Sequence, residues 1–178
     1  MRLPQIIVWE SDGWMARQLR ELAAENRWLL RSVRSARRLR QFLNAGGVYG
    51  VCLLQFEPWS EQREPIELLA EMHLRCPDIP VIAVSDVKLP EAERAAWTAS
   101  LFDLGARYVL FPPLTKPVLE DVVSGLMLAT LRRVIGDEEA TGMTRPDRSQ
   151  LVTEDRSAVS PSPQKSEVID LAQEEDEV

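Results

Sequence analysis

Short apolar runs alternate with amphipathic segments along the first 135 residues of this chain. The apolar runs are rich in β-branched residues, as in strands buried on both faces of a parallel sheet. They cover Ile6–Trp9, Trp28–Val33, Tyr49–Leu54, Pro80–Ser85 and Arg107–Phe111. The segments between them carry apolar residues at helical spacing and predict helices over Gly13–Arg27, Ala36–Asn44, Pro65–Arg75, Pro90–Leu104 and Lys116–Val134. Asp12 is expected to cap the first helix, and Pro90 to lie in the first turn of the fourth.

Strict alternation of strands and helices predicts an α/β fold in which right-handed crossovers build one parallel sheet with helices on both faces. At this size the common solution is a flavodoxin-like (βα)5 sandwich with a five-stranded sheet. The periodicity ends near Gly136, where Ser, Thr, Pro and charged residues take over. A disordered tail is typical of such a composition. The predicted organisation is therefore a domain over residues 1–135 and an acidic tail over 136–178.

The predicted domain and the predicted tail also differ in net charge. The tail holds twelve acidic and four basic residues, a net charge of −8, whereas the preceding residues sum to +1. Cys52 and Cys76 are the only cysteines, too few for a disulfide framework, which favours a reducing compartment. Neither a signal peptide nor a membrane-spanning run is evident in the sequence. The expectation is a cytoplasmic protein without a membrane segment.

Three segments carry a resemblance to a known family. They are a strand with an acidic end, Ile6–Ser11; a proline followed by a strand that ends in a hydroxyl, Cys76–Ser85; and a Gly-Ala segment that runs through a strand into proline, Leu104–Pro112. Together they resemble the receiver domain of bacterial two-component response regulators, over about residues 4–134. The resemblance implies a signalling role and the flavodoxin-like fold.

The family's chemistry depends on groups at the carboxyl ends of the strands. Acidic residues after strands one and three hold Mg²⁺, the aspartate after strand three accepts the phosphoryl group, and a hydroxyl and a lysine contact its oxygens. By this resemblance the five positions fall on Glu10, Ser11, Gln55, Ser85 and Phe111. A glutamine amide cannot form an acyl phosphate, and a phenylalanine cannot neutralise one. The resemblance therefore implies a degenerate pocket without catalysis, metal or cofactor.

The leading hypothesis is a pseudo-receiver, a protein-interaction module in bacterial signal transduction that does not depend on phosphorylation. An alternative is an atypical phosphoacceptor or ligand-binding switch that uses Glu57 or Glu10. Lys116 precedes a proline but lies five residues beyond the lysine position, so we interpret it as the first residue of a helix.

An arginine-rich zone leaves a third hypothesis open, a DNA-associated regulatory factor. Its members are Arg31, Arg34, Arg37, Arg38 and Arg40. Such a zone is also typical of a solvated surface, and no nucleic-acid-binding motif accompanies it.

Two further features suggest protein partners. A tail segment beside a carboxylate cluster resembles linear motifs that add a strand to a partner's sheet; it consists of Val168, Ile169, Asp170 and Leu171. The tail could equally act as a solubilising segment or bind the chain's own arginines. The last helix is apolar over more than one stripe, which favours a homodimer through the fourth helix, the fifth strand and the last helix, or a deeply covered helix.

Overall fold

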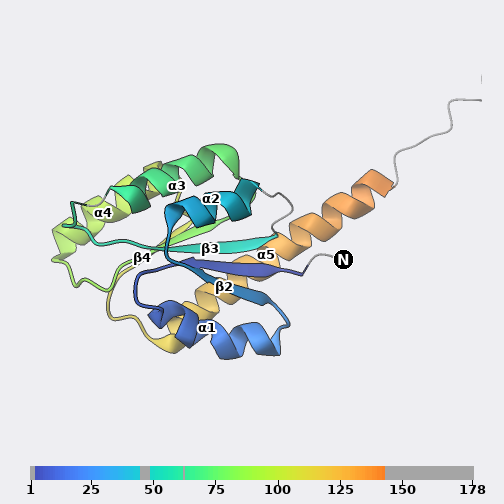
Figure 1. Cartoon of the computed structure of the whole chain (residues 1–178), viewed down its shortest axis with the longest axis horizontal. Helices are drawn as coiled ribbons and strands as arrows, with labels where there is room; N and C mark the ends of the chain where they lie inside the picture. The colour runs from blue at the N-terminus through green and yellow to red at the C-terminus, as the bar shows by residue number, and fades with distance from the viewer. Residues whose placement is uncertain (1–2, 45–48, 62, 143–178) are drawn as a thin grey trace, which may run out of the picture. The chain divides into compact units, whose positions relative to one another are not determined.

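The computed structural model describes residues 3–44, 49–61 and 63–142, and these form one parallel sheet between two layers of helices (Figure 1). The strand order is β2-β1-β3-β4-β5. The strands are β1 (Gln5–Trp9), β2 (Leu29–Val33), β3 (Gly50–Gln55), β4 (Val81–Val84) and β5 (Tyr108–Leu110). The helices are α1 (Trp14–Glu25), α2 (Ala36–Asn44), α3 (Glu64–Arg75), α4 (Glu91–Asp103) and α5 (Lys116–Gly142).

Each face of the sheet has its own core, because side chains of a strand alternate between the two faces. In β1, Ile7 packs against the layer of α2, α3 and α4, whereas Ile6 and Val8 pack against α1 and α5. In β3, Cys52 and Leu54 face the first layer, and Val51 and Leu53 face the second. Burial on both faces explains why these strands are continuous apolar runs.

The predicted fold class is confirmed, and the five predicted strands and helices are all present. The central position of β3 follows from its pairing with both β1 and β4. Within the described residues, no helix is apolar over a length that could cross a membrane.

Two of the predicted helix bounds are wrong. α5 continues to Gly142, beyond the predicted end at Val134. The added residues include Glu138, Glu139 and Ala140, which favour a helix even without an apolar stripe. Pro90 precedes α4 instead of lying in its first turn, with φ −55° and ψ 153°. The predicted tail from 143 onward, with Val168–Leu171, lies outside the described residues.

The start of β3 needs a glycine. Gly50 has φ +155°, and a Cβ built on it would lie 1.7 Å from the backbone oxygen of Gln5 in β1. Since any side chain would collide with backbone, glycine allows β3 to approach β1 closely. The close approach at Gly50 fixes the start of β3, and Gln55 lies at the other end of this strand.

Candidate functional site

The carboxyl ends of β1 and β3 lie side by side and carry Glu10 and Gln55, because the paired strands are parallel. Glu10 follows β1 directly and is 1% exposed. Its Oε2 accepts a hydrogen bond from Met15 N at 2.8 Å, and its Oε1 accepts from Ala16 N at 3.2 Å. Ser32 Oγ lies 3.2 Å from the same Oε1 and donates to it. Glu10 therefore serves as the acceptor for the first-turn amides of α1.

This arrangement corrects the prediction that Asp12 caps α1. Gly13 occupies the N-cap position with φ +76°, and the Asp12 carboxylate accepts a long hydrogen bond, from Trp14 N to its Oδ1 at 3.4 Å. The buried Glu10 supplies the shorter bonds because the left-handed Gly13 turns the start of α1 back over the end of β1. A negative charge at this position also interacts favourably with the helix dipole.

Gln55 is the last residue of β3 and is half-buried. Its Oε1 accepts hydrogen bonds from Ser11 N at 2.9 Å and from Ser11 Oγ at 3.2 Å. A backbone N–H can only donate, so the side-chain atom that faces it has to be the amide oxygen. The glutamine and serine predicted for this pocket thus bind each other across β1 and β3.

Glu10, Ser11 and Gln55 border a cleft of about 640 Å³ at this edge of the sheet. Four further acidic residues line it, namely Asp12, Glu57, Glu64 and Asp86, and Arg34 is the one cation among its lining residues. In the part of the chain that the structure describes, no group of three or more His, Cys, Asp or Glu side chains is placed to hold a metal ion.

Ser85 and Phe111, also predicted for this pocket, are not among the residues that line the cleft. Ser85 follows β4 and is fully buried, and its Oγ accepts a hydrogen bond from Val87 N at 3.2 Å. Phe111 follows β5 and packs edge-to-face on Phe56, with ring centroids 5.7 Å apart and an interplanar angle of 79°. Phe56 also contacts Trp97 of α4, at 5.8 Å between centroids. Phe111 therefore joins an aromatic cluster beside α4.

Glu57 and Lys116 were considered as substitutes for the missing phosphoacceptor and the missing lysine, and they differ in position. Glu57 is exposed and lines the cleft. Lys116 does not line it; its ammonium is paired with Glu21 of α1 and lies 3.8 Å from Glu120. The hydrogen bond to Glu21 raises the pKa of Lys116 and lowers the pKa of the Glu21 carboxyl. Lys116 is thus the first residue of α5, as predicted, and binds α1.

The arginine-rich zone is divided by internal contacts. Arg31 donates from Nε to Gln5 Oε1 at 3.0 Å and stacks on Phe42, with Cζ 4.9 Å from the ring centroid. Arg40 forms an ion pair with Glu71 at 2.7 Å, and its pKa is raised chiefly by that hydrogen bond. The other three, Arg34, Arg37 and Arg38, are exposed and have no side-chain partner among the described residues.

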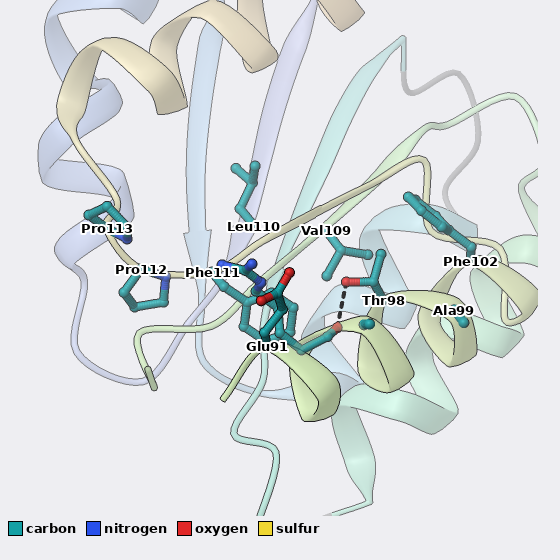
Figure 2. Close-up of a pocket in the computed structure, with 11 residues that line it drawn as sticks. Glu91, Thr98, Ala99, Phe102, Val109, Leu110, Phe111, Pro112 and Pro113 are labelled. Carbon is teal, nitrogen blue, oxygen red and sulfur yellow. Dashed lines mark hydrogen bonds between the residues drawn. The ribbon is translucent and has the colours of Figure 1, made fainter. Parts of the chain in front are cut away.

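The sequence did not indicate a second hollow of about 650 Å³, a groove between α4 and β5 (Figure 2). Phe111, Pro112 and Pro113 form one wall, and Thr98, Ala99 and Phe102 of α4 form the other. Phe102 is 49% exposed although it is large and apolar. A helix that packs on one sheet needs only one apolar stripe, and Leu101 belongs to that stripe in α4. The adjacent Phe102 lies outside the stripe, which is the sequence signal that could have indicated an exposed apolar site here.

Comparisons with known proteins bear on this fold. Neither a protein-family model nor a curated protein sequence matches the chain. Among solved structures, the receiver domain of the TMAO respiratory system response regulator TorR is similar, with a TM-score of 0.57 and 17% identity over 71% of this chain and 98% of that one.

Two other matches agree. A CheY-like receiver domain protein from Methanospirillum hungatei JF-1 has a TM-score of 0.58 and 14% identity over 74% of this chain and 99% of that one. NtrX from Brucella abortus has a TM-score of 0.60 and 17% identity over 84% of this chain and 32% of its own length. The described part of this chain therefore has the fold of a response regulator receiver domain.

Proposed function

We propose that this chain is a pseudo-receiver, a cytoplasmic protein-interaction module in bacterial signalling that works without phosphorylation. One observation carries the proposal: the central strand ends in Gln55, whose amide oxygen accepts both donors of Ser11. An amide has no carboxylate oxygen with which to attack a phosphodonor. The lone cation of the cleft, Arg34, is exposed and lies among carboxylates that repel an anion.

The experiment is incubation of the full chain with acetyl phosphate and Mg²⁺, followed by intact-mass spectrometry. A phosphorylatable receiver domain is treated in parallel as the positive control. We expect no added phosphoryl group on this chain, and the same result for the Glu57→Gln variant. A stoichiometric phosphoryl adduct on the wild type would refute the proposal.

The second candidate, an atypical switch, is favoured by the exposed Glu57, a carboxylate that lines the cleft near the end of β3. In the same experiment this candidate requires an adduct on the wild type that is absent from the Glu57→Gln variant. Glu10 is a weaker choice, because three donors already bind its carboxylate.

The interaction surface we propose is the face of α4, β5 and α5, with the α4–β5 groove at its centre. Large apolar side chains are exposed on these three elements, namely Phe102, Tyr108, Val118 and Leu128. Self-association through this face is the simplest use of it. Sedimentation velocity tests this part: we expect a wild-type dimer that Phe102→Ser weakens, and a monomeric wild type would contradict it.

A further inference from the structure

A third hollow lies at the opposite edge of the sheet, where β4 and β5 begin. It measures about 610 Å³, within the range of ligand pockets. Its walls come from the end of α3, the end of α4, the start of β4, the residues just before β5, and the middle of α5. The side chains relevant here are His73, Ile79, Phe102, Arg107, Thr130 and Arg133.

The charge of this pocket is one-sided. Among the side chains that the structure describes, none that lines the pocket is acidic, and Arg107 and Arg133 are both exposed with no carboxylate of that set within 4 Å. Three other cations of the domain are paired, since Arg40 and Arg75 contact Glu71 and Lys116 contacts Glu21. The unpaired arginines of α2 lie on an open surface instead of in a hollow. Two unpaired guanidinium groups in one hollow favour an anionic ligand, and planar guanidinium groups suit carboxylates in particular.

A buried hydroxyl in the same wall also lacks a partner. Thr130 is 4% exposed, and its Oγ1 has no hydrogen-bond partner within the described part of the chain. A threonine in a helix commonly donates to the carbonyl one turn earlier, so an unsatisfied Oγ1 is unusual. A ligand in the pocket would offer this hydroxyl an acceptor after a rotation about its Cα–Cβ bond.

The remaining surface is apolar. Phe102 is half exposed at the rim, and Ile79 and Leu126 lie deeper in the wall. A single inorganic anion would leave most of 610 Å³ unfilled, whereas several side chains of a peptide would fill it. We propose that this pocket binds an acidic segment of a protein partner, with carboxylates on Arg107 and Arg133 and an apolar side chain on Phe102.

This inference adds a binding site to the proposed function. It does not rest on Gln55 or on self-association, although Phe102 belongs both to this pocket and to the proposed dimer face. The test is a titration of the ¹⁵N-labelled full chain with the blocked peptide acetyl-Glu-Leu-Glu-Glu-Leu-Glu-amide. We expect saturable shifts of the amides of Arg107, Thr130 and Arg133. The all-glutamine version of the peptide provides the matched ligand control.

Two double variants locate the site. Arg107→Gln with Arg133→Gln is expected to weaken binding about tenfold, and Arg37→Gln with Arg38→Gln, on exposed arginines of α2, is expected to leave it unchanged. An unchanged spectrum outside the pocket shows that each variant is folded. Equal binding of the glutamine peptide, equal loss in the α2 variant, or no shifts at these amides would overturn the inference. Equal shifts with a short DNA duplex would also overturn it and would assign the pocket to nucleic acid. Shifts that depend on protein concentration in the absence of peptide would overturn it as well and would assign the pocket to a second copy of the chain.

Discussion

At the scale of single residues, the polar groups at the carboxyl ends of β1 and β3 are bound to one another. Glu10 accepts hydrogen bonds from two amides of α1 and from Ser32, and Gln55 accepts both donors of Ser11. The contact with Ser32 and the contacts between Gln55 and Ser11 join segments that are distant in sequence, whereas the two amides of α1 follow Glu10 closely. Two polar side chains of the cleft, the Glu10 carboxylate and the Gln55 amide, therefore hold the neighbouring segments in place, as in a structural site.

Replacement of Glu10 measures this structural role. Glu10→Ala leaves the amides of Met15 and Ala16 and the Ser32 hydroxyl without their acceptor, and we expect a loss of about 2–3 kcal/mol in the free energy of unfolding. Urea denaturation followed by circular dichroism gives the value. The matched control is Asp12→Asn, an exposed residue with one long contact, expected to cost less than about 0.5 kcal/mol. Equal losses in both variants would contradict the capping role.

At the scale of elements, an exposed ion pair joins α1 to α5 on one face of the sheet. Lys116, the first residue of α5, pairs with Glu21 of α1 and approaches Glu120 one turn further along its own helix. The same two helices share the apolar core of Met15, Leu19 and Met127. The apolar core supplies most of the stabilisation of the contact between α1 and α5. The ion pair adds a contribution that depends on pH, because both of its groups titrate.

The sign of that pH dependence follows from the Glu21 carboxyl. Its pKa is lowered in the folded chain by the hydrogen bond from Lys116, so the pair stabilises the fold at neutral pH and loses this effect as pH falls through the lowered pKa. Glu21→Gln is therefore expected to be less stable than the wild type at pH 7, and the difference should vanish in acid. Urea midpoints at several pH values test this.

Added salt should shrink the same difference at pH 7, because the pair is exposed to solvent. Glu61→Gln, an exposed loop residue of the same type, is the matched control. If the stability difference between the wild type and Glu21→Gln is the same at pH 7 and in acid, the ion pair makes no pH-dependent contribution to stability.

At the scale of the whole molecule, the sequence predicted the architecture because the central strands β1, β3 and β4 are buried on both faces and apolar residues recur at helical spacing between the strands. The role of Glu10 could not be predicted, since it depends on how Gly13 turns α1 over the end of β1. Phe111 was assigned to the cleft from its place in a motif, but its ring meets Phe56 instead. The pocket around Thr130 combines residues of α3, α4, β4 and α5, a combination that no local pattern contains.

The distribution of charge over the whole chain argues against the DNA hypothesis. The net charge is −7, and residues 136–178 alone carry −8. Of the five arginines in the basic zone, Arg31 and Arg40 are held by internal partners. The three that remain exposed are too few to offset the repulsion between a negative protein and phosphates, which acts over a Debye length of about 10 Å in 0.1 M salt.

We therefore expect no saturable binding of duplex DNA by the full chain, at low or at physiological ionic strength, in fluorescence anisotropy with a labelled duplex. Arg37→Gln with Arg38→Gln should behave as the wild type does. DNA association through this zone has the opposite signature: an affinity that falls steeply with salt, as it does when counterions are released from phosphates, and a shallower salt slope in the double variant. The comparison of the two slopes separates contact with these arginines from non-specific attraction elsewhere on the chain, because only the former changes when the two charges are removed.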